Sequence, residues 1–299
     1  MTRMPRIEHA YAFVNGVRLH YATAGTGRLM LFLHGFPEFW RAWQQPLEHF
    51  GARGWRALAP DLRGYNLSDK PAGVEQYKAK TLIADVARLA ARFSAEPFVL
   101  VAHDWGGALA WGLAIAHPKL LSHLVIVNAP HPYTFWRELA HNPAQQQASD
   151  YMLLLRDAKA ERVLSENGYA RLGRMVFDES GGAFSAEDRA AYREAWAQPG
   201  ALTGGLNYYR ASPLYPPSAA DPGAARLALR PQDFVVRVPT LVLWGERDRA
   251  LLLGCLDGLE QCVPDLVVRR VPGASHWIVH EQPALVCSEI ERFIAAPRA

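Results

Sequence analysis

The sequence predicts an α/β fold in which a mostly parallel sheet carries helices on both faces and a helical cap is inserted into the core. Three observations lead to this fold class. Short apolar runs alternate with stretches of helical periodicity, a hairpin signal lies near the N-terminus, and a long middle segment has no strand pattern. Such alternation is typical of parallel sheets that helices cover on both faces.

The elements follow in order along the chain. Asn15-Gly16 separates two strand-like runs and is a strong signal for a two-residue hairpin, so these runs predict an antiparallel pair. The predicted strands are residues 9–14, 17–22, 29–33, 55–59, 98–102, 124–127, 240–244 and 266–271. The predicted core helices are residues 39–51, 78–94, 106–117, 251–262 and 283–295. Because helices alternate with the later strands, those strands are expected to run parallel.

The segment from His131 to Val236 interrupts this order. It holds helical stretches at residues 150–165 and 186–197 and ends in a proline-rich part that is typical of loops. A segment of this length is too long for an ordinary connection between two strands. We therefore predict a helical cap over residues 131–235, inserted into a core formed by residues 1–130 and 236–299.

Composition argues against several classes of protein. The chain has 299 residues and a net charge of only +3 with scattered basic residues, so nucleic-acid binding is not expected. No run approaches the roughly 18 apolar residues that a membrane span needs, and residues 1–16 lack the apolar run of a signal peptide. The three cysteines form no Cys-x-x-Cys pair and are expected to be reduced, which predicts a cytoplasmic protein. The histidines have no metal-ligand spacing, so neither a metal nor a cofactor is expected.

Residues 102–107 read Ala-His-Asp-Trp-Gly-Gly and lie between a predicted strand and a predicted helix. A strand-turn-helix elbow of this kind presents a nucleophile. Here that position is Asp104, whose carboxylate needs no proton removed before it attacks, so the chemistry shifts from ester cleavage toward opening strained or activated carbon centres. The alternative is that Asp104 only caps the helix that follows.

A second candidate segment, His34-Gly35-Phe36-Pro37, follows the strand predicted at residues 29–33. Gly35 permits a tight turn, after which the backbone N–H of Phe36 is expected to point into the site. Together with the N–H of Trp105, it would supply two donors to a developing oxyanion. The alternative is an ordinary turn at the end of a strand.

Two further segments follow the last two strands, and in open α/β sheets ligands bind at such carboxyl ends. Gly245-Glu246-Arg247-Asp248 offers two carboxylates that could orient a histidine. Gly273-Ala274-Ser275-His276-Trp277 offers the histidine, and the position of His276 after the final strand predicts a catalytic role.

These segments together resemble the α/β-hydrolase superfamily over essentially the whole chain, and within it the epoxide-hydrolase-like branch. The strings that carry the resemblance, in order, are HGFPEFW, DLRGYNLSDKP, HDWGG, GERD and GASHW. The resemblance implies the α/β-hydrolase fold and a catalytic set of Asp104, Asp248 and His276, in the chain order of that superfamily. One departure is Ala102, which stands two residues before the acid where glycine is usual.

The resemblance also implies two cap tyrosines whose hydroxyls point at the epoxide oxygen. One belongs to an Asn-aromatic-Tyr-Arg string, which here is residues 207–210 and indicates Tyr209, with Tyr208 as the fallback. The other resembles Tyr151 at the start of a cap helix. The alternative is that both tyrosines are amphipathic core residues of the cap.

The implied reaction opens an epoxide to a vicinal diol through a covalent ester of Asp104, which water activated by His276 and Asp248 then hydrolyses. The main alternative is a haloalkane or haloacid dehalogenase with the same nucleophile. Asp104-Trp105 fits a haloalkane enzyme, whereas Trp105 cannot hold a substrate carboxylate as an arginine would. A non-catalytic binding protein on the same scaffold is a further alternative, although it would lack a member of the triad.

Three aromatic side chains, Trp40, Trp277 and Phe135, are predicted to line a hydrophobic substrate pocket. The expected partners are therefore a small apolar epoxide or halogenated molecule and water, with no membrane and no nucleic acid. The sequence predicts no particular oligomeric state.

Overall fold

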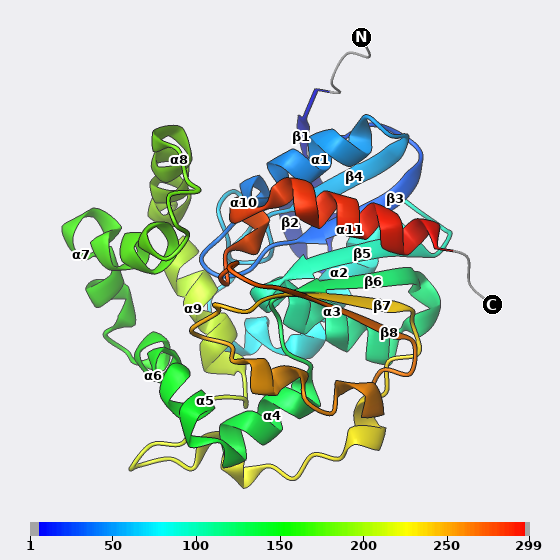
Figure 1. Ribbon diagram of the computed structural model, residues 1–299. Helices are drawn as coiled ribbons and strands as arrows, with labels where there is room; N and C mark the ends of the chain where they lie inside the picture. The colour runs from blue at the N-terminus through cyan, green and yellow to red at the C-terminus, as the bar shows by residue number, and fades with distance from the viewer. Residues whose placement is uncertain (1–5, 297–299) are drawn as a thin grey trace.

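The computed structural model describes residues 6–296, and an eight-stranded sheet lies at the centre of this part of the chain (Figure 1). The strand order is β1-β2-β4-β3-β5-β6-β7-β8; β2 is antiparallel to β1 and β4, and the remaining pairs are parallel. The strands are β1 Glu8–Val14, β2 Val17–Ala24, β3 Arg28–Leu33, β4 Trp55–Pro60, β5 Phe98–His103, β6 Leu121–Val127, β7 Thr240–Gly245 and β8 Leu266–Val271. The predicted fold class and its strands are confirmed.

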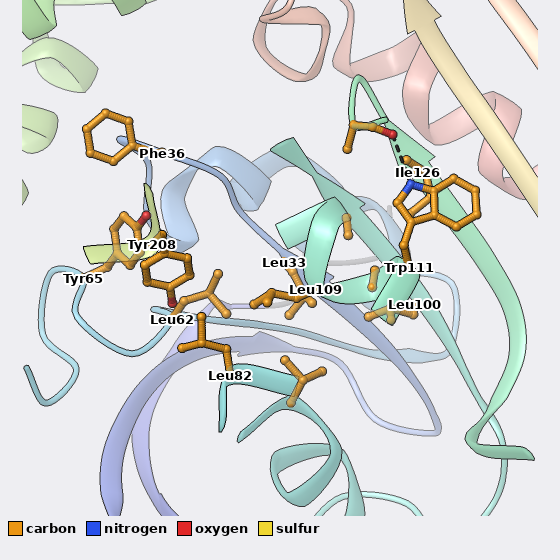
Figure 2. Packing of buried hydrophobic residues seen from close by; sticks show 14 of the residues in the cluster. Leu33, Phe36, Leu62, Tyr65, Leu82, Leu100, Leu109, Trp111, Ile126 and Tyr208 are labelled. Carbon is orange, nitrogen blue, oxygen red and sulfur yellow. Dashed lines mark hydrogen bonds between the residues drawn. The ribbon is translucent and has the colours of Figure 1, made fainter. Parts of the chain in front are cut away.

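Alternation along the central strands divides the core into two layers. In β3, Leu31 and Leu33 pack with one buried cluster, whereas Met30 and Phe32 pack with the other. Helices α2 (Ala79–Ala91) and α3 (Asp104–Ala116) cover the first face. Helices α1 (Gln44–Gly51), α10 (Ile278–Glu281) and α11 (Pro283–Ala295) cover the second. Figure 2 shows part of the first layer, in which the Trp111 indole N–H donates to the carbonyl of Ala129 over 3.1 Å.

Between β6 and β7 the described chain forms helices and loops without a strand. The helices are α4 Pro132–His141, α5 Pro143–Ala148, α6 Tyr151–Arg156, α7 Ala160–Gly173, α8 Ala186–Ala197 and α9 Ala201–Ala211. In Figure 1, helices α6–α9 stand as a green group beside the sheet, with α9 nearest to it. We call residues 132–211 the inserted helices; the division into core and cap at residues 131 and 235 stays a prediction.

Three predicted helices differ from the structure. The predicted helix at residues 251–262 is wrong, because this segment forms two 3₁₀ turns, Leu253–Leu256 and Leu259–Gln261. Gly258 has φ +71° between them, a left-handed conformation that no α-helix continues through. The helix predicted at 39–51 begins as a 3₁₀ turn, Trp40–Trp43, and the one predicted at 150–165 divides between α6 and α7.

None of the helices found in residues 6–296 has both the length and the apolar character that crossing a lipid bilayer requires.

Candidate active site

Asp104 lies at a sharp turn between β5 and α3. Its φ of +49° is in the left-handed region, which a non-glycine residue adopts only where the surrounding structure imposes it. The helix begins so close to β3 that a Cβ on Gly106 would lie 2.5 Å from the carbonyl oxygen of Leu33. A Cβ on Gly35 would likewise overlap the side chain of Asp104. These two glycines therefore allow the carboxylate to approach the end of β3.

The two oxygens of Asp104 have different surroundings. The backbone N–H of Phe36 donates to Oδ1 over 2.7 Å, whereas Oδ2 lies 3.7 Å from Nε2 of His276. Among the described residues the carboxylate of Asp104 accepts no backbone N–H of α3, so the capping alternative does not hold. Of the two predicted oxyanion donors, Phe36 contacts Asp104; within residues 6–296 the N–H of Trp105 makes no hydrogen bond with this carboxylate.

The buried carboxylate of Asp248 orients the imidazole of His276. Its Nδ1 lies 2.7 Å from Oδ2 of Asp248, and the amide of Asn128 donates to the same oxygen over 2.8 Å. The backbone N–H groups of Ala250 and Leu251 donate to the other oxygen, each over 2.9 Å. With every oxygen of Asp248 hydrogen-bonded, the carboxylate and the Nδ1–H of His276 are fixed, and Nε2 faces Asp104.

The charges of this cluster shift its titration. Burial lowers the pKa of His276, but the carboxylates of Asp248 and Asp104 raise it more, to about 9. Burial raises the pKa of Asp248, yet the charge of His276 and the hydrogen bonds lower it below its usual range. Because its pKa exceeds the ordinary 6.5, protonated His276 stabilises the fold fully below pH 6.5, and this contribution is lost as the pH rises through about 9.

Asn128 is a residue that the sequence reasoning did not assign to the site. It lies at the end of β6 with φ +38°, and its Oδ1 accepts the N–H of Gly245 over 2.8 Å. Its position at the carboxyl end of a central strand, next to the strand that precedes Asp248, is the signal that could have identified it.

Glu38 is the second residue that was missed. It is fully buried, and its carboxylate lies 2.8 Å from Nδ1 of His103 and 2.6 Å from Nε2 of His280. The other nitrogen of His103 bonds the carbonyl of His276 over 2.9 Å, so the pair supports the loop that carries His276. Burial raises the pKa of Glu38, but the histidines beside it lower the pKa well below the usual range. Its place in HGFPEFW was the available signal.

Tyr151 and Tyr209 come together above Asp104. Tyr151 begins α6 and Tyr209 lies on α9, and their rings are arranged edge-on with centroids 6.3 Å apart. Burial and the negative charge of Asp104 both raise the pKa of each phenol, so both keep their protons and can donate. The hydroxyl of Tyr208 instead donates to the carbonyl of Arg63 over 2.9 Å, which removes it as the fallback.

Two arginines fix α6 and α9 relative to each other. Arg156, at the end of α6, donates to the carbonyls of Tyr209 and, over 3.0 Å, Ser212. Arg210 of α9 donates to the carbonyl of Asp157, which directly follows α6, over 3.0 Å, and pairs with Glu161 of α7 over 2.6 Å. Arg156 and Arg210 therefore link the end of α6 to the end of α9 in both directions.

Two cavities meet at Asp104, Tyr151 and Tyr209. One has a volume of about 80 Å³ and is lined by Phe135; the other has about 300 Å³ and is lined by His276 and Trp277. The placement of Trp40 in the substrate pocket is wrong, because its ring packs edge-on against His9 with centroids 4.7 Å apart and lines neither cavity. Within residues 6–296 no group of three or more histidine, cysteine, aspartate or glutamate side chains is placed to hold a metal.

Comparison with known proteins shows which family this chain belongs to. The model of a family described as alpha/beta hydrolase fold matches residues 28–283. AB hydrolase superfamily protein YfhM of Bacillus subtilis (strain 168) is 38% identical over 287 residues, covering 95% of this chain and 96% of that protein. Epoxide hydrolase 3 of Xenopus tropicalis is 35% identical over 300 residues, covering 96% of this chain and 78% of that protein.

Solved structures that resemble this chain are also those of epoxide hydrolases. The epoxide hydrolase of Bacillus megaterium, in complex with an inhibitor, is 35% identical and superposes with a TM-score of 0.88 over 96% of this chain and all of that one. A mutant of an epoxide hydrolase from the same organism, complexed with its product (R)-3-[1]naphthyloxy-propane-1,2-diol, is 34% identical with the same TM-score and coverage.

Proposed function

This chain belongs to the α/β-hydrolase family and is an enzyme of the epoxide-hydrolase-like type, and from this premise we propose that it hydrolyses epoxides to vicinal diols. The observation that carries the proposal is the tyrosine pair. Two protonated phenols face the same cavity as a carboxylate nucleophile, so a substrate oxygen can accept from both while its carbon meets Asp104. The product named for the Bacillus megaterium structure, a 1,2-diol, agrees with this chemistry.

In the first step Oδ2 of Asp104 attacks an epoxide carbon. A carbon–oxygen bond of the ring breaks, an alkyl ester of Asp104 forms, and the ring oxygen takes a proton from Tyr151 or Tyr209. Esterification removes the negative charge of Asp104, one of the charges that raise the pKa of His276. His276 then gives up its proton to solvent, and the tyrosine that protonated the ring oxygen takes one up, so the charges balance before the second step.

In the second step neutral His276 takes a proton from water, and the hydroxide attacks Cγ of the Asp104 ester. The oxyanion that develops on Oδ1 is stabilised by the N–H of Phe36, which already donates there, and by the N–H of Trp105 at the start of α3. Collapse breaks the bond between Cγ and Oδ2, and His276 gives its proton to the departing diol. The proton left on the new carboxyl group of Asp104 then passes to His276, which restores the carboxylate and the protonated imidazole. Asp248 keeps the imidazole oriented throughout.

The tyrosines provide the first test. Y151F and Y209F are each expected to lower the rate of ester formation roughly 10- to 100-fold, and the double variant further, because each removes a donor to the ring oxygen. Pre-steady-state tryptophan fluorescence with styrene oxide measures this step. Y208F is the matched control, since the hydroxyl of Tyr208 faces Arg63. An unchanged rate of ester formation in Y151F/Y209F would contradict the proposed role of the two tyrosines as donors to the ring oxygen.

The same variants separate epoxide opening from the dehalogenase alternative. The indole of Trp105, which a dehalogenase would use for the leaving halide, packs edge-on against the ring of Tyr209, with ring centroids 5.0 Å apart. We expect diol from styrene oxide and no bromide from 1-bromobutane. Bromide release that survives in Y151F/Y209F would establish the alternative.

The ester intermediate should have its own pH dependence. Neutral His276 is the base, and its pKa in the ester lies below the value of about 9 in the free enzyme because the charge of Asp104 is gone. The decay rate of the ester is therefore expected to rise with pH and level off below pH 9. Stopped-flow fluorescence after a pH jump follows the decay, and NMR titration of His276 gives the free-enzyme pKa. A decay rate that does not change between pH 5 and 9 would exclude His276 as the base.

A further inference from the structure

We propose that Arg171 and Arg249 bind a carboxylate of the substrate, so that this enzyme prefers epoxides that carry a negative charge at the end remote from the ring. The inference rests on the proposed function and names its substrate class. Both arginines line the cavity of about 300 Å³ that also contains Asp104 and His276. We call the end of this cavity formed by the exposed side chains of Arg171, Glu179 and Arg249 the mouth.

The guanidinium groups of the two arginines are available to a ligand. Within residues 6–296 neither forms an ion pair or a hydrogen bond. Arg171 lies on α7, whereas Arg249 follows Asp248 in the loop after β7, so the inserted helices and the core each supply one cation. A guanidinium presents a planar set of N–H donors that matches the two oxygens of a carboxylate. The mouth therefore offers donors of the right kind from two sides.

Glu179 is the acidic residue of the mouth, and its charge opposes those of the arginines. Its carboxylate makes no ion pair or hydrogen bond with Arg171 or Arg249 in the described part of the chain. Partial burial raises the pKa of Glu179, although the positive charges of Arg249 and His276 act to lower it. Two cations and one anion leave the mouth with a net positive charge, which attracts an anionic group.

The rest of the cavity determines where on the substrate that anionic group can be. Between the reacting groups and the mouth the wall is mostly apolar, with the side chains of Phe36, Leu154, Leu155, Met175 and Trp277. An aromatic or short aliphatic linker fits this wall, because it removes apolar surface from water. A carboxylate next to the ring would instead lie beside the charge of Asp104, away from water, which is unfavourable.

The first test compares 4-(2,3-epoxypropoxy)benzoate with 4-(2,3-epoxypropoxy)benzamide, which has nearly the same shape and no charge. We expect the wild type to show a kcat/KM roughly two- to tenfold higher for the benzoate at about 20 mM salt, and a ratio near one at about 1 M, because salt screens exposed charges. The position of the charge is tested with 2,3-epoxypropanoate, which should be a poorer substrate than 2,3-epoxypropanamide.

Charge variants test the mouth directly. R171Q and R249Q should each lower the benzoate-to-benzamide ratio of kcat/KM roughly two- to fivefold, whereas E179Q should raise it. R162Q is the matched control, since Arg162 is an exposed arginine of the same helix as Arg171 that lines neither cavity at Asp104, and it should keep the wild-type ratio. A ratio of two substrates measured on one variant does not depend on how much of that variant is folded.

The outcomes separate the two proposals. A wild-type ratio near one, or a higher ratio that neither R171Q nor R249Q changes, overturns the carboxylate site, while diol formation from the benzamide keeps the proposed function. If neither the benzamide nor styrene oxide yields a diol, the proposed function fails, and the carboxylate site fails with it. A ratio above one that the two arginine variants lower and E179Q raises supports the carboxylate site.

Discussion

D104N is expected to abolish diol formation, with kcat reduced by roughly 10⁴-fold or more. The amide keeps the shape of the side chain, but it is a far weaker nucleophile than the carboxylate whose Oδ2 faces His276 at 3.7 Å. No covalent adduct should form, so intact-mass spectrometry after mixing with excess styrene oxide should show the unmodified protein. Chiral chromatography of the diol gives the residual rate.

The control for this variant is D233N, because Asp233 is a surface carboxylate paired with Arg230 and distant in sequence from the site. Equal melting temperatures for D104N and the wild type would show that the loss is chemical. Turnover of D104N within tenfold of the wild type would contradict the covalent mechanism.

H276Q is expected to separate the two half-reactions. Ring opening depends on Asp104 and the tyrosines, so the ester should still form, with the proton for the opened ring drawn from solvent. Its hydrolysis lacks a general base and should slow by roughly 10²- to 10⁴-fold. Intact mass should then show one protein species heavier by the mass of one epoxide, and peptide mapping should place it on Asp104.

H117Q, at an exposed histidine that follows α3, is the matched control and should turn over without accumulating the adduct. H276Q with wild-type turnover would rule out the assigned role of His276. An adduct in H276Q that maps to another carboxylate would do the same for Asp104.

The sequence predicts those features that depend on local residue patterns. The strands were placed to within a few residues, because short apolar runs and the Asn15-Gly16 turn determine them without reference to distant parts of the chain. The carboxyl ends of β5, β7 and β8 carry Asp104, Asp248 and His276, and a parallel sheet brings such ends to one edge. The topology brings the three residues to one edge, where His276 lies 2.7 Å from Asp248 and 3.7 Å from Asp104.

Features that depend on packing between distant segments were not predictable in this way. Glu38 interacts with His103 and His280, which lie 65 and 242 positions away along the chain. For Trp40, its place beside a site motif predicts a pocket residue, whereas its ring contacts His9, a residue 31 positions earlier in the chain. The helix predicted at 251–262 failed because one left-handed glycine outweighed the apolar spacing around it.

Because the N–H of Phe36 holds Oδ1, only one of the two oxygens of Asp104 is expected to be exchanged during turnover. In the proposed reaction Oδ2 leaves with every molecule of diol, and an oxygen atom from water takes its place in the carboxylate. Oδ1, anchored by the Phe36 N–H, stays in the protein from one turnover to the next. The nucleophile is thus half permanent and half renewed, and the oxygen that water supplies in one cycle becomes a hydroxyl of the product in a later one.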